Sequence, residues 1–466
     1  MLLIARRQLM DGLRDAKFLF FATLVLVVFT ANGFIYSDWY SKSIHDWNYA
    51  SSNNLKVVQE RADNLQELAN HEQMMVKPPS ALAFIADGGE QMLPNAFKVN
   101  AFYVGSVQKL SRDNKVLPVL GALDWSFIVG NLMTFVAALI GFGTICGEKR
   151  DGTLRLLLSY PISRIKLVTG KLIGLAFALI IVFLLGAAIS LSILIFNGVL
   201  PLTPEVGYKI GWAVLTSVLC LLFALTVSVA VSALVHNPAV AMVIIMIGWV
   251  FFVFAIPGLA RLIAEQSVEI KSKFEIQQEV NAAYDSIDQE IPASWKIWYG
   301  EPFHESVPNR AEWRRRTVAA MLKVIDDSLQ KNINQAEVVN WLSIASPVGL
   351  LDSAFQELNG TGVHGFKQLL SATRRYRSQL YNFVKEIDSR DKETPHILYP
   401  YSRGDRGVIS TKPVNVNSVP RYQELWLAGG LAPKSDLPLT HLIILVLGIL
   451  QAGIIALIAV ARYDPR

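Results

Sequence analysis

Six long apolar stretches constrain this chain more than any other feature. A helix needs about 20 mostly apolar residues to cross the hydrocarbon core of a membrane, because unpaired backbone groups cannot remain in lipid. The stretches reach about that length and run over residues 18–36, 125–146, 167–196, 210–235, 239–257 and 437–460. The sequence therefore predicts an all-α integral membrane protein with six transmembrane helices.

The composition of the 466-residue chain agrees with this prediction. Hydrophobic residues make up 52% and charged residues 17% of the chain, and the mean hydropathy is +0.36. The formal net charge of +5 comes from Lys and Arg beside the apolar stretches rather than from a basic stripe among aromatic residues, which argues against nucleic acid as a partner. Cys146 and Cys220 both lie within apolar stretches, so they predict neither a disulfide nor a metal site.

The positions of Lys and Arg predict the orientation of the chain, since short cationic segments stay on the cytoplasmic side. These residues cluster before the first stretch, between the second and third, and after the sixth, whereas residues 197–207 contain none. Both termini are therefore expected in the cytoplasm of a multi-pass inner-membrane protein. Two large inserts, residues 37–124 and 258–436, are expected on the extracytoplasmic side.

Residues 1–17 predict a short helix that lies along the inner membrane surface and contacts lipid. At 100° per residue, Leu2, Ala5 and Leu9 share one face and Arg7 lies opposite. A secretory signal peptide is the alternative, because cationic residues precede an apolar run. That run is long for a signal peptide, so we interpret it as the first membrane span.

The two inserts are predicted to differ in secondary structure. The first is expected to be α+β, with a helix over residues 41–76 that Pro78 and Pro79 end, and short strands over 81–86 and 97–104. The second is expected to be mainly helical. Its predicted helices are 259–287, 311–342 and 363–388, followed by an irregular tail over 394–438.

Residues 147–166, between the second and third stretches, have the pattern of a docking helix. Glycine and a hydroxyl residue favour a helix start, three leucines form an apolar ridge at helical spacing, and a proline favours a stop. The residues singled out are Glu148, Gly152, Thr153, Leu154, Leu157, Leu158, Pro161 and Arg164. A short rigid helix here could transmit force from a soluble partner to the spans. A solvated basic loop remains the alternative.

The same segment carries a family resemblance. Its pattern Glu-Lys-x-x-Gly-Thr-Leu-x-x-Leu-Leu-Ser-x-Pro-Ile-Ser-Arg, from Glu148 to Arg164, is followed by Gly170-Lys171 and resembles the signature of type-2 ATP-binding-cassette (ABC) exporter permeases. In that family this loop contacts the ATP-binding subunit. The resemblance therefore implies ABC ATP-binding subunits, which carry ATP and Mg²⁺, and a second permease copy or homologue as partners.

Two further pieces resemble a subgroup of these permeases with large extracytoplasmic inserts. They are residues 79–84, followed by Gly88-Gly89 and residues 93–95, and the stretch 346–362. Members of this subgroup are named for copper-enzyme maturation or gliding motility. A large first insert departs from ordinary type-2 exporters and argues against simple lipid or drug export. A second function stays open: a mechanotransmitter that drives an extracytoplasmic protein partner without transport.

The chain lacks the sequence of a phosphate-binding loop, which has two glycines bracketing four residues, then Lys and Ser or Thr. Residues 360–367 come closest but have Phe366 in place of the lysine. No matched nucleophile and base and no helical zinc pair stand out, so a membrane-bound enzyme is the less favoured alternative. No metal or other cofactor is expected in this chain.

Small residues in the spans offer the remaining candidates. Ser217, Ala224, Ser228 and Ser232 fall on one side of the fourth stretch and predict close helix packing, with a substrate-lining face as the alternative. The pairs Gly143/Gly147 and Gly170/Gly174 likewise predict helix contacts. Lys171 lies near the inner end of the third stretch and is expected to extend its amine to the membrane surface.

Overall fold

The computed structural model describes residues 1–88, 94–108, 123–293, 303–400, 408–422 and 438–463. Six helical segments within these ranges are long and apolar enough to cross a membrane, so the predicted fold class is confirmed. They are Ala16–Arg61, Trp125–Arg150, Arg164–Phe196, Pro204–Leu234, Pro238–Ser267 and Leu439–Ala461. The predicted start of the sixth span, Leu437, lies outside the described residues.

The bundle consists of α1 (Leu2–Arg14), α2 (Ala16–Arg61), α4 (Trp125–Phe127), the π-helix η2 (Ile128–Met133), α5 (Thr134–Gly141), α6 (Cys146–Arg150), α7 (Thr153–Ser159), α8 (Arg164–Phe196), α9 (Pro204–Leu234), α10 (Pro238–Val250), the π-helix η3 (Phe251–Ala255), α11 (Ile256–Ser267) and α17 (Leu439–Ala461).

Capping side chains fix several ends of these helices. The side chains of Ser163, Thr203 and Asn237 accept hydrogen bonds from first-turn backbone N–H groups of α8, α9 and α10. Pro204 and Pro238 stand at first helical positions, where no N–H donor is needed.

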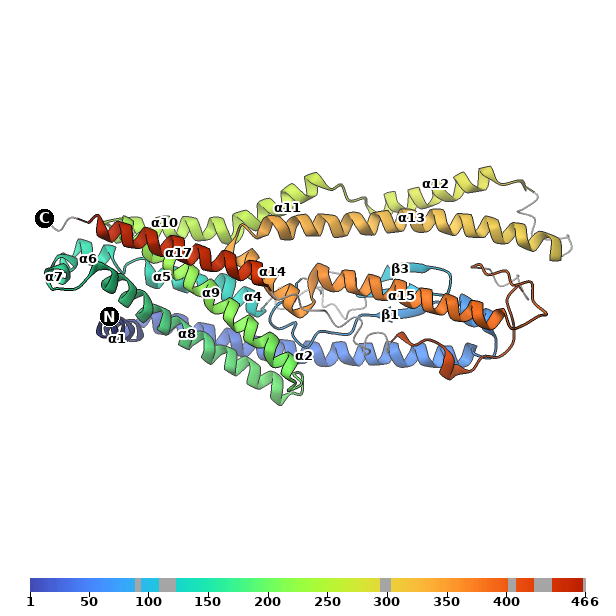
Figure 1. Cartoon of the computed structure of the whole chain (residues 1–466), viewed down its shortest axis with the longest axis horizontal. Helices are drawn as coiled ribbons and strands as arrows, with labels where there is room; N and C mark the ends of the chain where they lie inside the picture. Colours follow the sequence, from blue (N-terminus) through green and yellow to red (C-terminus); the bar gives the residue numbers. More distant parts are fainter. Residues whose placement is uncertain (89–93, 109–122, 294–302, 401–407, 423–437, 464–466) are drawn as a thin grey trace.

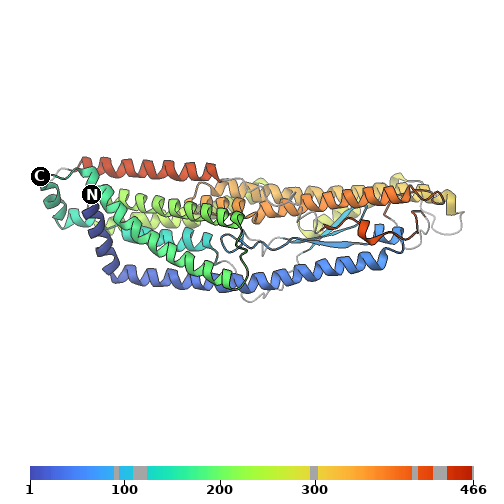
Figure 2. The ribbon, with the colours of Figure 1, turned by 60° about the horizontal axis from the view of Figure 1, so that its bottom comes forward.

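The molecule is elongated, with the helix bundle at one end and both inserts at the other (Figure 1). The two termini lie together at the free end of the bundle, beside α6 and α7 (Figures 1 and 2). We call this the loop end of the molecule. The loop between the second and third spans and both termini therefore share one end, as the sequence predicts, and the inserts share the opposite end.

Two of the helices that hold spans continue well beyond the predicted ends. The first does not stop at Tyr36, because α2 runs unbroken to Arg61. The fifth does not stop at Pro257, because η3 and α11 carry it to Ser267. The first polar residues show where an apolar stretch ends in the sequence. The helix itself can continue past that point when the polar residues that follow also favour a helix.

The second span is less regular than predicted. The π-helix η2 follows α4, and a turn over residues 142–145 separates α5 from α6. Within η2 the backbone of Gly130 approaches Val348 so closely that a Cβ there would lie 2.8 Å from Val348 Cγ1. A π-helical turn is a common device for such local adjustment of a helix.

The first insert is α+β as expected, but its boundaries differ. Its elements after α2 are α3 (Leu65–Asn70), β1 (Gln73–Val76), β2 (Ala96–Val99) and β3 (Val104–Gln108), which form one antiparallel sheet in the order β1-β2-β3. The predicted helix over 41–76 was wrong after Arg61, where α3 and β1 follow. Residues 81–85 form turns rather than the predicted strand, because their side chains pack into the core at the end of the bundle next to the inserts. We call this the outer end of the bundle.

The second insert is mainly helical, as predicted. It contains α12 (Lys273–Glu290), α13 (Phe303–Ser343), α14 (Pro347–Asn359), α15 (Gly362–Asp388) and the short 3₁₀ helix η5 (Val416–Ser418). The predicted single helix over 259–287 was wrong, since the chain breaks between Ser267 and Lys273, where Ser272 caps α12 with a capping box. The described parts of the tail, 394–400 and 408–422, are irregular as predicted and pack beside α3 and α15.

Candidate functional site

The loop between the second and third spans forms the expected short helix. Gly152 has φ +71°, a left-handed conformation that favours glycine, and it ends α6 so that α7 can start at Thr153. Tyr160 then turns to an extended conformation and the exposed Pro161 follows, so α7 ends there. The predicted helix start and stop are confirmed.

The leucine ridge of α7 faces the chain's own bundle. Leu154 is 1% exposed, and Leu157 and Leu158 pack half-buried against the same apolar cluster of α5, α8 and α9 side chains. On the opposite face Leu156 is 66% exposed, and Tyr160, directly after α7, is 65% exposed. The ridge therefore anchors α7, and the surface open to another protein is formed by residues that the helical pattern did not single out. A periodic pattern identifies a covered face without showing which body covers it.

Glu148 is paired within the chain. Its carboxylate forms a salt bridge with the amine of Lys171, about two turns into α8, and Lys171 Nζ also donates to the carbonyl of Thr144 at 2.8 Å. Lys171 is only 3% exposed, so the predicted extension of its amine to the membrane surface was wrong. The carboxylate lies close enough to hold the amine inside the bundle, which makes this pairing more favourable than leaving an unpaired charge there.

Lys149, the next residue, holds a different helix. Its amine donates to the carbonyl of Ala233 and lies 3.4 Å from the carbonyl oxygen of Val235, at the end of α9. A cation at this position interacts favourably with the carbonyl end of the helix. Ser232 of α9 reciprocates, since its Oγ accepts hydrogen bonds from the N–H groups of Ile145 and Cys146 at 3.0 and 3.1 Å. These contacts tie α6 to α9.

Arg164 caps a third helix. Its guanidinium donates to the carbonyl of Val460 at 3.0 Å and also to that of Ala461, at the end of α17. The singled-out residues of the loop therefore have distinct places. Leu154 and its ridge anchor α7, Glu148 and Arg164 hold neighbouring helices, and Thr153 donates to the carbonyl of Glu148 at 3.4 Å.

The small residues of α9 are packed between helices. Ser228 donates to the carbonyl of Ala138 in α5 at 2.9 Å, and Ser217 donates to its own helix at Ala213. Ala224 is half-buried beside the apolar cluster around Leu154. These contacts agree with the packing interpretation of this face.

The two glycine pairs behave differently. Gly170 and Gly174 let α1 approach α8, since a Cβ on either would meet α1 atoms at 3.1 and 2.5 Å. Among the described residues, nothing lies within 4 Å of a Cβ built at Gly143 or Gly147, so their predicted helix contact was wrong.

The pieces that suggest the insert-bearing subgroup meet at the outer end of the bundle. Thr361 donates to the carbonyl of Ala86 at 2.9 Å, and a Cβ on Gly88 would lie 2.8 Å from the backbone N of Gly362. Gly88 and Gly362 both have positive φ, which only glycine adopts easily. We call residues 84–88, 123–126 and 346–362 the junction. Gly89 and Leu93, also part of the resemblance, lie outside the described residues.

Two buried residues in or beside the junction, Asn32 and Trp125, were not among those singled out from the sequence. Asn32, within the first span, donates to the carbonyls of Phe84 and Leu123 and accepts from Ser190 at 2.7 Å. A lone Asn in an apolar stretch is the signal that could have revealed it, since such residues need partners in the membrane. Trp125 is fully buried and packs edge-on against Phe84.

Two buried carboxyl groups lie at the same place. Asp124 caps α4 and accepts backbone hydrogen bonds from Phe127 and Asp87 at 2.8 and 2.9 Å, while Asp352 of α14 accepts from Ser126 at 2.8 Å and Gln356 at 2.7 Å. Burial raises the pKa of both carboxyl groups, and the neighbouring Asp352 raises the pKa of Asp124 further. Protonation at one of them relieves their repulsion.

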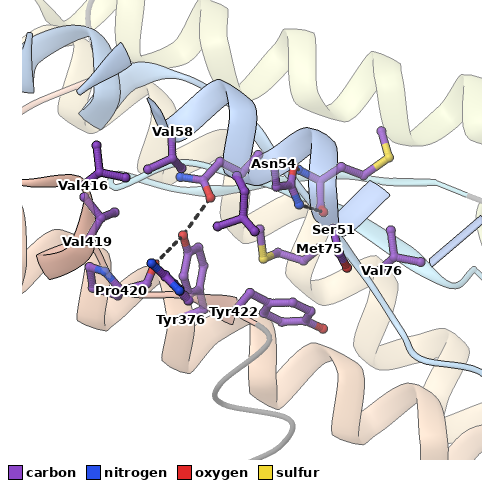
Figure 3. A pocket seen from close by; sticks show the side chains of 14 residues that line it. Ser51, Asn54, Val58, Met75, Val76, Tyr376, Val416, Val419, Pro420 and Tyr422 are labelled. Atoms are coloured by element: carbon purple, nitrogen blue, oxygen red, sulfur yellow. Dashed lines mark hydrogen bonds between the residues drawn. The ribbon is translucent and has the colours of Figure 1, made fainter. Parts of the chain in front are cut away.

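A small pocket lies farther out, between the outer half of α2, β1, α15 and the tail (Figure 3). The hydroxyl of Tyr376 lies 2.7 Å from Gln73 Oε1 and 3.3 Å from the carbonyl oxygen of Pro420 (Figure 3). The space has room for little more than a water molecule, so we interpret it as a packing detail that holds the tail. Within the described ranges, no group of three or more His, Cys, Asp or Glu residues is arranged to hold a metal ion.

Comparison with known proteins assigns the family. The model for the ABC-2 family transporter protein matches residues 2–373, most of the chain and all of its loop end except α17. This chain belongs to the ABC-2 transporter family. It is a multi-pass inner-membrane permease, and the resemblance noted in the α6–α7 loop is thereby confirmed at the level of the family.

Two relatives share a shorter stretch. The probable ABC transporter permease protein NosY of Stutzerimonas stutzeri is 37% identical over 67 residues, which cover 14% of this chain and 24% of the relative. The protein of the same description from Pseudomonas aeruginosa is 40% identical over 76 residues, which cover 16% and 26%. The chain thus matches about a quarter of the length of these curated relatives.

Proposed function

We propose that this chain is the membrane subunit of an ABC exporter and that the exposed face of α7 docks a separate ATP-binding subunit. The observation that carries this proposal is the division of α7 into two faces. One face is anchored by Leu154, while Leu156 on the other face and Tyr160 directly after the helix expose two large, mainly apolar side chains at the loop end. Exposed apolar residues on an anchored helix are suited to a protein contact.

The ATP and Mg²⁺ belong to that partner subunit. The chain has no phosphate-binding loop sequence, so hydrolysis needs another polypeptide. By the family's pattern, two permease copies or homologues pair with two ATP-binding subunits. The cationic residues near α6, α7 and both termini support a cytoplasmic location for the loop end.

Cysteine labelling in intact cells tests the orientation. We expect a cysteine at the exposed Ser418 of the tail to react with an impermeant reagent, whereas one at the exposed Arg155 of α7 stays unlabelled. Labelling at Arg155 alone would place the loop end outside and remove the basis of the docking proposal.

Work on an extracytoplasmic partner is the second candidate function. The observation that favours it is the continuity of α2, which runs 46 residues from the loop end into the first insert. At 1.5 Å per residue such a helix is about 69 Å long, so a tilt at one end displaces the far end without crossing a hinge. Substrate uptake into inverted vesicles separates the two functions. ATP-dependent uptake supports export. If there is no uptake but a copurified extracytoplasmic protein stimulates ATP turnover, the result supports mechanical work.

Affinity purification in mild detergent tests the proposal as a whole. We expect an ATP-binding subunit to copurify with the wild type, and its recovery to fall at least tenfold with the double substitution Leu156→Ala/Tyr160→Ala, since a few central apolar residues dominate such contacts. Tyr49→Ala is the matched control, because Tyr49 is equally exposed on the outer half of α2. Unchanged recovery with the double substitution would contradict docking at α7.

A further inference from the structure

We infer that the ion pair between Glu148 and Lys171 is the joint through which movement of α7 reaches the third span. Lys171 is thus a positioning residue for coupling, an inference that rests on the proposed docking at α7. The observation behind it is that Glu148 uses its carboxylate inside the chain, on Lys171 of α8, rather than presenting it to a partner.

The geometry gives α6 a central place. It is a five-residue helix directly before Gly152 and α7. Two adjacent side chains of α6 reach different spans. Glu148 pairs with Lys171 of α8, and Lys149 holds the carbonyl end of α9. Besides the direct packing of its leucine ridge on the bundle, α7 is joined to the spans through α6 and through the extended residues 160–163.

The two contacts of α6 differ in kind. Lys149 donates to backbone carbonyls, which are present whatever the sequence of α9. The contact with α8 depends on one particular side chain, since Lys171 lies between the Glu148 carboxylate and the Thr144 carbonyl. Both of these acceptors precede α7 on the segment that it moves. The Lys171 amine is therefore bound by two acceptors, one in the turn and one in the helix that lead into α7.

Burial strengthens the ion pair between Glu148 and Lys171. The Lys171 side chain is 4% exposed and that of Glu148 27%, so water competes little for the amine. Separating buried opposite charges costs far more than separating exposed ones, and α8 is therefore drawn along with α6 rather than left behind. The exposed pair Arg150–Asp151, at the end of α6, lacks this property.

The test uses the full chain in complex with its copurifying ATP-binding subunit. The variants are Glu148→Gln, Lys171→Met, the double Glu148→Gln/Lys171→Met and the charge-conserving Lys171→Arg. Asp151→Asn is the control, since it neutralises an exposed carboxylate three residues away. The readouts are recovery of the ATP-binding subunit, ATP turnover in liposomes, and the ATP-dependent change in distance between spin labels at Asn197 and Leu439, near the outer ends of α8 and α17.

We expect Glu148→Gln to bind the ATP-binding subunit like the wild type but to lose the distance change and at least tenfold of the coupled turnover. The double variant should be no worse than the poorer single variant, because both remove one joint. Lys171→Arg should retain most of the distance change, and Asp151→Asn all of it. Glu148→Gln has the shape of the native side chain, so it carries the test even where Lys171→Met lowers the yield.

Failure of the proposed function and failure of this inference give different results. If the wild type recovers no ATP-binding subunit, the proposed function fails. If it does recover the subunit and Glu148→Gln keeps its distance change and turnover, the joint does not exist. Losses that multiply in the double variant would also overturn the inference, since they would mean that the two residues act separately.

Discussion

The loop end and the junction are held together in different ways. At the loop end, charged side chains hold helix ends: Glu148 binds Lys171, Lys149 caps α9 and Arg164 caps α17. At the junction, glycine contacts, a hydrogen bond from the Thr361 side chain to the Ala86 carbonyl and a buried tryptophan fill the space between α14 and the spans. Helix-end contacts can shift without opening a cavity, whereas tight packing cannot.

This difference suggests that motion starts at the loop end and that the junction transmits it to the inserts without deforming. α7, which is anchored by its leucine ridge and exposes Leu156 on its other side, is suited to receive a push. A densely packed junction transmits that push because it has few ways to deform. Substitutions at either end test this difference.

The largest effect is expected at the junction, from Trp125→Ala. The indole is fully buried against Phe29, Phe84 and Phe183, so its loss should cost about 3 to 5 kcal/mol of stability. Thermal unfolding in detergent measures this. Phe20→Ala is the control, since Phe20 is 64% exposed on α2 and should change little. Equal shifts for the two variants would mean that the junction is not densely packed.

A smaller loss is expected at the loop end from Leu154→Ala. This side chain anchors α7, and its removal should cost about 2 kcal/mol or more. Leu156→Ala, two residues away and exposed, should leave the melting temperature unchanged. The same thermal measurement decides the matter, and a destabilised Leu156→Ala would mean that α7 lies on the bundle by its other face.

The helix-end contacts should each contribute modestly. Arg164→Gln removes the charge that caps α17 and should cost about 1 kcal/mol, as expected for a partly exposed charged cap. Lys166→Gln, an exposed neighbour, serves as the control. The melting temperatures of both variants at low ionic strength report the effect, and a loss as large as that of Trp125→Ala would remove the contrast between the two ends.

The smallest effect concerns pH at the junction. Burial raises the pKa of Asp352, so the folded chain holds a proton that the unfolded chain has released above its ordinary pKa of about 3.9. That contribution to stability is complete below the unfolded pKa and is lost as pH rises through the folded pKa. We expect Asp352→Asn, whose amide can still bond Ser126 and Gln356, to flatten the fall in melting temperature as pH rises above that ordinary pKa, by about 1 °C. Asp151→Asn should keep the slope of the wild type, and an unchanged slope for Asp352→Asn would refute the raised pKa of this carboxyl group.

The sequence predicted the spans well because length and apolarity are local properties. Gly152, Thr153 and Pro161 likewise fixed the limits of α7 from local backbone preferences. The role of Glu148 was beyond reach, since Lys171 lies 23 positions later in the chain and only the packing of α6 on α8 brings them together. The same holds for Asn32, whose partners Phe84, within the first insert, and Leu123, near the end of that insert, are distant in the sequence.

Site-specific photo-crosslinking tests the central claim most directly. A photoreactive residue at position 156, where the structure exposes Leu156 on α7, should capture an ATP-binding subunit in cells, and the same residue at Tyr49 should not. Position 154 should give only crosslinks within the chain, because Leu154 faces the bundle. Capture of the ATP-binding subunit from Tyr49, or its absence from position 156 when the subunit copurifies, would contradict docking at α7.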